Sequence, residues 1–301
     1  MFRVFEATVC GVSCALLISG CGSILIRPAV DNVKTVALVS VSMNRDFYDV
    51  KAPRTTSVSL ESLKPLGHAV SKGTEIPGEI NEQFAKEYEA MITHGAQVYS
   101  ERLEGVGNWK WMPVADVLSS NAYKEFADSF AGKHSNRLIQ AAATIKESEW
   151  YTARDMVRIP VESVAQSGKV IRVGGTTGPL ADMHLTLGKL CKDLNVDAVA
   201  ILVFDMAYKK PLISVSFIDN APAIPSINAT LVLVNKDGEI AVNSGPITKG
   251  QGKRFEGDKV GMLRQDYVQL DDKSVSSYDM AIDKSAEDMK QRLATAFGKI
   301  K

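Results

Sequence analysis

Residues 194–204, Leu-Asn-Val-Asp-Ala-Val-Ala-Ile-Leu-Val-Phe, decide the fold of this 301-residue chain. Residues 180–194 carry apolar side chains at helical spacing, and this pattern predicts a helix that ends where the stretch begins. The helix leads through Val196, Asp197 and Ala198 into an apolar strand predicted at residues 199–204. A helix followed at once by such a strand is typical of a sheet with helices packed on it.

The chain beyond this stretch indicates a hairpin and a closing helix. Apolar and polar residues alternate over residues 212–218, which predicts a half-buried strand. Predicted strands at 227–234 and 239–242 flank the turn 235–238, Asn-Lys-Asp-Gly, whose Asp-Gly pair is a strong hairpin indicator. Apolar residues then form one stripe along residues 278–297, as expected of a terminal helix.

The first half of the chain begins with a nearly continuous apolar run at residues 34–43, which favours a central strand covered on both faces. Residues 44–77 are polar and rich in turn formers, so we interpret them as a long insertion. Residues 79–103 have the spacing of an amphipathic helix, in which Gly95 marks a close packing point or a break. Shorter predicted elements are a strand at 109–112, helices at 114–118, 123–130 and 138–150, and a strand at 169–173.

This order of strands and helices predicts an α/β (α+β) fold with a mixed sheet and helices packed on it. We place the folded domain at residues 34–301, with insertions near 44–77 and 123–170. The aromatic residues Trp109, Trp111 and Tyr123 are interpreted as core, and Pro222 and Pro225 as an exposed stiff loop between strands.

The stretch 194–199, the hairpin turning at 236–238 and the long final helix together resemble a broad group of envelope domains. The group includes the amino-terminal domain of the Tol translocation protein, the curli secretion lipoprotein, and lipoproteins that assist exopolysaccharide export or activate peptidoglycan synthases. The resemblance covers about half of the chain, and residues 44–77 and 123–170 depart from the compact members. It implies a role in the assembly of an envelope structure.

A second pattern lies at the N-terminus, where Ile18-Ser19-Gly20-Cys21 closes a short apolar run over residues 9–18. This run is too short to cross a hydrocarbon core, which needs roughly 20 apolar residues. Arg3 supplies the basic start, although Glu6 offsets its charge. We therefore predict a signal peptide at residues 1–20; the alternatives are an ordinary secretory signal or an uncleaved apolar N-terminus.

The small-small-Cys pattern resembles the site at which bacterial lipoproteins are cut and lipidated. The resemblance implies lipidation of Cys21 by a diacylglyceryl thioether and an amide-linked acyl chain such as palmitate, and two or more chains give stable attachment. Gly22 implies sorting to the outer membrane, with the domain facing the periplasm. Residues 21–33 are then expected to form a lipidated tether.

Charge and cysteine content narrow the possible partners. The 35 basic residues balance the 35 acidic ones without a basic block, which argues against a nucleic acid partner. Of the four cysteines, Cys10 and Cys14 fall in the signal peptide and Cys21 is the lipidation site. Cys191 is left without a disulfide partner, and its helical spacing predicts a buried apolar role.

The sequence shows no catalytic motif. The histidines, which form no His-Glu-x-x-His pair, are His68, His94, His134 and His184. We expect no metal, no cofactor and no catalytic residue, and we interpret Asp197 as serving the helix-to-strand turn, with Asp205 and Asp219 at solvated strand ends. The turn 174–179 follows a predicted strand and opens a helix, so its N–H groups offer an alternative site for an anionic ligand.

We therefore expect a lipid-anchored periplasmic assembly or scaffolding component of an envelope machine for secretion, export or surface-structure assembly. Its expected partners are the membrane, other envelope proteins and further copies of itself as a homo-oligomer. The alternative is a periplasmic ligand-binding protein or enzyme that uses the turn 174–179.

Overall fold

A computed structural model describes residues 24–44, 78–133, 150–161, 164, 183–209, 222–245, 253–262 and 272–298. The elements in chain order are β1 (Thr35–Asn44), α2 (Gly78–Leu103), the 3₁₀ helix η1 (Val106–Asn108), β2 (Lys110–Met112), α3 (Val114–Ser119), α4 (Asn121–Lys133), β3 (Trp150–Thr152), α7 (Met183–Asp193), β4 (Ala198–Lys209), β5 (Pro222–Asn235), β6 (Ile240–Asn243), β7 (Phe255–Glu256), β8 (Val260–Met262) and α8 (Asp272–Gly298). The predictions for 45–77, 138–149, 169–179 and 212–218 lie outside the described residues.

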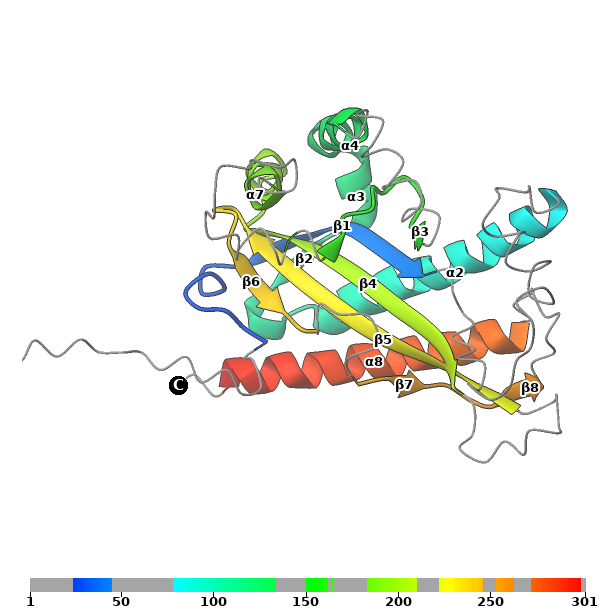
Figure 1. The fold of residues 1–301 in the computed structure, drawn as a ribbon. Helices are drawn as coiled ribbons and strands as arrows, with labels where there is room; N and C mark the ends of the chain where they lie inside the picture. Colours follow the sequence, from blue (N-terminus) through cyan, green and yellow to red (C-terminus); the bar gives the residue numbers. More distant parts are fainter. Residues whose placement is uncertain are drawn as a thin grey trace, which may run out of the picture.

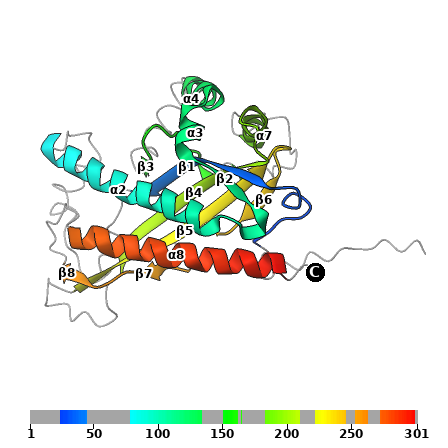
Figure 2. The ribbon, with the colours of Figure 1, turned by 180° about the vertical axis from the view of Figure 1, so that it is seen from behind.

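These elements build three layers around one mixed sheet (Figure 1). Helices α2 and α8 pack against each other across one face, and Figure 2 shows them side by side in front of the sheet. Helices α3, α4 and α7 cover the opposite face. The predicted fold class, a mixed sheet with helices packed on it, is confirmed.

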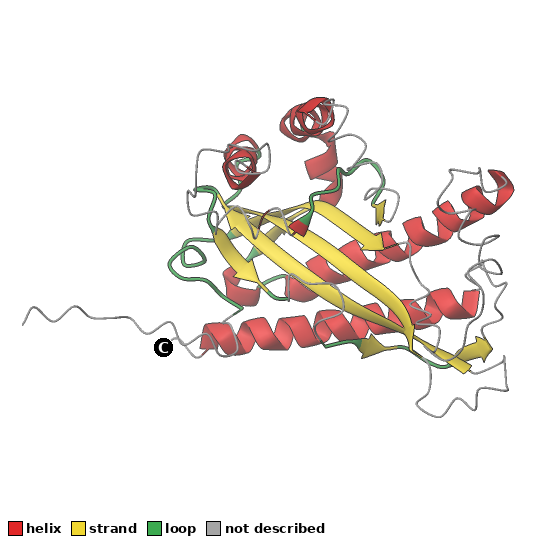
Figure 3. Ribbon diagram, viewed as in Figure 1, coloured by secondary structure: helices red, strands yellow, loops and turns green. Residues whose placement is uncertain are grey.

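The central strand order is β2-β1-β4-β5-β6, with β3 beside β1 and with β7 and β8 beside β5 (Figure 3). Strand β1 runs parallel to β2 and β4, whereas β5 runs antiparallel to β4 and β6. The parallel starts of β1, β2 and β4 therefore meet the β5–β6 turn at the same end of the sheet. We call this end, made of residues 24–34, 195–197 and 235–239, the hairpin end.

Apolar side chains on both faces hold the sheet between its helices. In β4, Ala200, Leu202 and Phe204 face the core under α2 and α8, whereas Val199 and Ile201 face α7. This alternation follows from the two-residue period of a strand. It explains why the predicted strands read as almost continuous apolar runs.

Gly95 is a packing point within an unbroken α2. A Cβ built at Gly95 would lie 2.7 Å from the Phe204 ring, so α2 approaches β4 closely because glycine has no side chain there. The Phe204 ring also packs edge-on against Tyr99, with centroids 5.5 Å apart. Of the two interpretations of Gly95, the structure selects close packing.

The aromatic residues interpreted as core are confirmed for Trp109 and Tyr123, each 1% exposed. They do not form one cluster, because they belong to the cores on opposite faces of the sheet. Trp109 meets Phe297 of α8 edge-on at 5.4 Å, and Trp111 packs, partly buried, against the same core.

Two boundary predictions were wrong. Pro222 and Pro225 lie in β5 and not in an exposed loop, and β5 continues to pair with β4 as far as Ile224 and Lys209. Trp150 begins β3, which pairs with the end of β1, and does not close a helix. In both places pairing with another strand overrides the local pattern.

The described part of 123–170, expected as an insertion, contributes to the core. Tyr123 of α4 donates a hydrogen bond from its hydroxyl to the carbonyl of Val39 at 2.9 Å and accepts one from the Val157 N–H at 3.0 Å. Ile159 is fully buried beneath the same face of the sheet. This segment is thus an integral layer of the fold.

Candidate functional site

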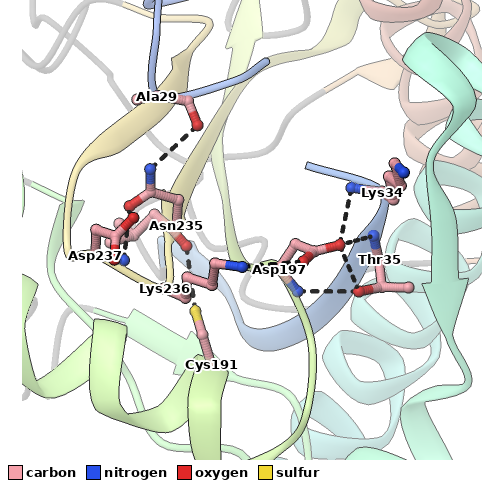
Figure 4. A network of polar contacts seen from close by, with 9 residues as sticks. Ala29, Lys34, Thr35, Cys191, Asp197, Asn235, Lys236 and Asp237 are labelled. Carbon is pink, nitrogen blue, oxygen red and sulfur yellow. Dashed lines mark hydrogen bonds and ion pairs between the residues drawn. The ribbon is translucent and has the colours of Figure 1, made fainter. Parts of the chain in front are cut away.

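The hairpin end is organised by the carboxylate of Asp197, which lies between α7 and β4. Its Oδ2 accepts hydrogen bonds from the Lys34 N–H at 3.1 Å, the Thr35 N–H at 3.0 Å and the Thr35 hydroxyl at 3.0 Å (Figure 4). The Lys236 Nζ lies 3.8 Å from Oδ1. One side chain therefore fixes the start of β1, the start of β4 and the β5–β6 turn together, which extends the role predicted for Asp197 in the helix-to-strand turn.

The pKa of Asp197 is lowered from its ordinary value. Burial alone raises the pKa, but the hydrogen bonds from Thr35 and Lys34 and the positive charge of Lys236 stabilise the carboxylate and outweigh it. The site therefore holds a negative charge that the surrounding backbone N–H groups satisfy.

We expect Asp197→Ala to lower the free energy of unfolding at neutral pH by about 2 kcal/mol, because hydrogen bonds to a charged group are lost. Since the folded-state pKa is lowered, the wild-type advantage is present above the unfolded pKa of about 4 and is lost as the pH falls through the folded value. Urea unfolding at several pH values measures it. Asp237→Ala, a change at an exposed turn position, is the control, and an advantage for the wild type that does not vary with pH would contradict the assignment.

Asn235 joins the hairpin turn to the N-terminal segment. Its side-chain oxygen accepts hydrogen bonds from the N–H groups of Asp237 at 3.0 Å and Glu239 at 2.9 Å, which closes the predicted turn. Its side-chain amide donates to the carbonyl of Ala29 at 3.1 Å (Figure 4). Gly238, at φ 81°, lets this turn pack on α7, because a Cβ there would lie 2.9 Å from the His184 carbonyl oxygen.

Residues 24–33, expected within a tether, pack on the domain. Leu25 pairs with Val242 of β6, the Ile26 N–H donates to the carbonyl of Ala241 at 2.9 Å, and the Asn243 N–H donates to the carbonyl of Ile24 at 3.0 Å. The buried side chains of this segment are Ile24, Leu25, Ala29, Val30 and Val33. The segment covers the edge of β6, which would otherwise expose unpaired backbone groups.

The predicted lipidation site Cys21 lies outside the described residues, and only Gly22 and Ser23 separate it from Ile24. The alternative ligand turn at 174–179, together with Asp219, His68 and His134, also lies outside them.

Cys191 is fully buried in α7, as the sequence predicts. Burial raises the pKa of its thiol to about 12, and its Sγ donates to the carbonyl of Val234 at 3.4 Å. A buried thiol with a raised pKa is a poor nucleophile, since the thiolate is the reactive form.

The prediction that Asp205 lies at a solvated strand end is wrong. Asp205 is paired within β4, and its carboxylate is 2.5 Å from the Arg254 guanidinium, which also donates to the Asp205 carbonyl at 3.1 Å. The Asp205 side chain is 14% exposed. This ion pair ties the segment before β7 to the centre of the sheet, so its role is structural.

A cluster of titratable side chains between α2 and α8 contains His94, Asp279 and Asp283. The His94 Nε2 lies 3.7 Å from the Asp283 carboxylate, while Asp279 Oδ1 is buried without a hydrogen-bond partner. The pKa of Asp279 is raised by burial, while the attraction of His94 lowers it and the repulsion of Asp283 adds to the rise.

We expect Asp279→Asn to raise the free energy of unfolding at neutral pH, because the variant no longer buries an unpartnered charge. With a raised folded-state pKa, the stability that the wild-type residue contributes is present below the unfolded pKa and is lost as the pH rises through the folded value. Urea unfolding across this range should give two curves that separate as the pH rises. Asp128→Asn, a change at an exposed position of α4 on the opposite face of the sheet, is the control, and wild-type and Asp279→Asn curves that stay parallel would contradict the prediction.

A cavity of about 350 Å³ lies between β5, the segment around β7, and α8. Its charged residues already have partners: Lys253 pairs with Asp288 at 2.5 Å, and Arg292 donates to the Ser244 carbonyl at 2.9 Å. Its lining residues come from positions far apart in the chain and form no sequence motif, so the sequence gives no indication of this cavity. Within the described ranges, no group of three or more His, Cys, Asp or Glu residues is placed to hold a metal ion.

Comparison with known proteins gives no match, either to a family model or to a curated protein sequence. In the part of the chain that the structure describes, no helix is long and apolar enough to cross a membrane.

Proposed function

We propose that the chain is exported, cut before Cys21, acylated on that cysteine and held at the outer membrane as a periplasmic assembly or scaffolding component of an envelope machine. In this role it performs no catalysis. Its partners are other envelope proteins and further copies of itself.

The observation that carries the proposal is the continuity between the lipidation pattern and the folded domain. Ile18-Ser19-Gly20-Cys21 is followed after two residues by Ile24, whose carbonyl already accepts a hydrogen bond from Asn243 of β6. An acyl group on Cys21 would therefore attach to the domain almost directly. Three acyl chains on one residue would make that attachment stable, since two are enough for stable anchoring.

The anchor is tested by intact-mass spectrometry of the protein purified from a bacterial membrane fraction. The expected mature chain begins at Cys21 and carries the mass of a diacylglyceryl group and an amide-linked acyl chain. Metabolic labelling with palmitate should mark the wild type and leave Cys21→Ser unlabelled. A mature chain that begins elsewhere, or label that persists in Cys21→Ser, would refute the anchor.

The assembly role is tested by cross-linking in cells from a photoreactive residue placed in segment 45–77, the predicted insertion without Asn44, which is buried in β1. Adducts with envelope proteins or with a second copy support a scaffolding component. A matched residue at Lys259 controls for random collisions, because it directly precedes β8, which lies at the opposite end of the sheet from the N-terminal segment (Figure 1). A protein that stays monomeric at high concentration and forms no adduct from 45–77 would argue strongly against the role.

A further inference from the structure

The position of residues 24–33 bears on how an anchored domain would stand on a membrane. These residues are fixed to β6 by hydrogen bonds with Ala241 and Asn243, and to the β5–β6 turn by the Asn235 amide, which donates to the Ala29 carbonyl. Figure 1 shows this segment at one end of the sheet, with β8 and the start of α8 at the other. The point at which the domain receives its N-terminal chain is therefore set by the fold.

We infer that the hairpin end lies against the bilayer, with Ile26 at the lipid interface and the long axes of α2 and α8 leading away from it. The inference rests on the acylation of Cys21 proposed above. The lipidation pattern alone does not specify which surface of the domain faces the lipid, and the inference identifies that surface.

Chain length carries the first step. Consecutive Cα atoms lie 3.8 Å apart, so the Cα of Cys21 is at most about 11 Å from that of Ile24. The 27 residues of α8 span about 40 Å at 1.5 Å per residue. A connection this short, attached at one end of a domain this long, keeps the β8 end far from the acyl chains.

The exposed apolar side chains carry the second step. Among the described residues, the large hydrophobic side chains that are exposed are Ile26, at 39%, and Leu185, at 56%. Ile26 lies in the N-terminal segment, and Leu185 follows His184, whose carbonyl touches Gly238 in the hairpin turn. Ile26 bonds through its N–H to Ala241 of β6, so both residues belong to segments that pack against the β5–β6 hairpin. Contact with a lipid interface there would remove apolar surface from water.

Attraction of basic residues to anionic lipid does not account for a membrane contact at the hairpin end. Of the three basic residues in the hairpin end, Arg27 pairs with Asp31 at 3.1 Å and Lys236 lies 3.8 Å from Asp197, which leaves Lys34 as a single cation. Paired cations give little attraction to anionic lipid, which requires several unpaired basic residues together. The orientation thus follows from the acyl attachment and the apolar contact.

The test uses the full chain, expressed with its N-terminal segment, purified from membranes and reconstituted into phosphatidylcholine vesicles. Single cysteines at Ile26→Cys or Lys259→Cys carry a fluorescent NBD label; Cys21 is consumed by acylation and Cys191 is buried. Some of the vesicles contain lipid with a nitroxide quencher near the headgroup. We expect the Ile26→Cys label to lose most of its emission in these vesicles and the Lys259→Cys label to keep its emission.

Intact mass separates the two proposals. If Cys21 carries no acyl group, the anchor and the orientation both fail. If Cys21 is acylated but the Lys259→Cys label is quenched as strongly as the Ile26→Cys label, the orientation is wrong and the anchor stands. Arg27→Cys, an exposed neighbour of Ile26, provides a second reporter with the same expected loss, and a label there that keeps its emission would also overturn the orientation.

Discussion

Replacing Phe204 by alanine is expected to lower the free energy of unfolding by about 4 kcal/mol, the typical cost of deleting a large buried aromatic side chain. Phe204 is fully buried at the point where α2 crosses β4, and its ring fills the space left by Gly95. The edge-on contact with Tyr99 is lost as well. Equilibrium urea unfolding followed by tryptophan fluorescence measures the change.

The contact between Gly95 and Phe204 also provides a control, because the effect of Gly95→Ala on stability should change sign when Phe204 is replaced. In the wild-type chain, Gly95→Ala is expected to destabilise the fold, because the new Cβ would lie 2.7 Å from the Phe204 ring. In the Phe204→Ala background the same change should stabilise it, since the methyl group fills part of the cavity and alanine favours the helix. Gly298→Ala, which meets nothing within 4 Å, should show no such dependence on Phe204. Two independent effects of Phe204 and Gly95 that simply add would contradict the proposed contact.

Phe204 also shows why the sequence predicts the elements of this fold better than their ends. Residues 199–204 are almost all apolar because the sheet is covered on both faces, and this run predicts the strand correctly. The run stops at Asp205, and the predicted strand stops with it. The real β4 continues to Lys209 because Arg254 neutralises Asp205 and β5 pairs along the whole length. Neither partner is adjacent in sequence.

The register between β1 and β4 is set by a side chain that carries no local pattern. Asn44, 2% exposed, donates to the Met206 carbonyl at 3.0 Å and accepts from the Met206 N–H at 2.5 Å. The amide thus extends the ladder beyond the last residue pair of the two strands. A polar residue at the end of an apolar run is typical of a loop, so the local sequence predicts that Asn44 begins the insertion.

In the candidate site, too, the local turn roles of residues can be predicted from the sequence, whereas their long-range hydrogen bonds cannot. Asp197 could be assigned to a turn from sequence, because carboxylates favour such positions. Its bonds to Lys34 and Thr35 could not, since they join residues more than 160 positions apart. Asn235 was recognised as a turn residue, but its second role, as a donor to Ala29, depends on where the N-terminal segment lies.

The structure differs most from the sequence-based prediction in residues 24–33, which were expected to form a tether and are instead packed on the domain. Residues 24–33 contain Pro28 and Asp31 and show neither the strand nor the helix period, so a tether was the natural expectation. Their burial depends on the free edge of β6, a surface that exists only after the β5–β6 hairpin has formed.

If this segment is part of the domain, Leu25→Ala should lower the free energy of unfolding by about 3 kcal/mol, as for other buried leucines. Leu25 is 4% exposed and packs in the core beneath α2 and α8. Its neighbour Ile26 makes the matched control, because its backbone N–H also bonds to β6 but its side chain is 39% exposed. Ile26→Ala should change the stability by no more than about 0.5 kcal/mol.

The pair distinguishes a docked segment from a tether, because a tether contributes little to folding and both substitutions would then leave the unfolding curve unchanged. A docked segment gives the large difference between adjacent positions that burial alone dictates. It also links the anchor to the fold, since the residues that follow Cys21 would leave the surface only when the edge of β6 opens. Equal and small effects of Leu25→Ala and Ile26→Ala would detach the segment from the domain, and with it the reason for expecting a fixed face toward the lipid.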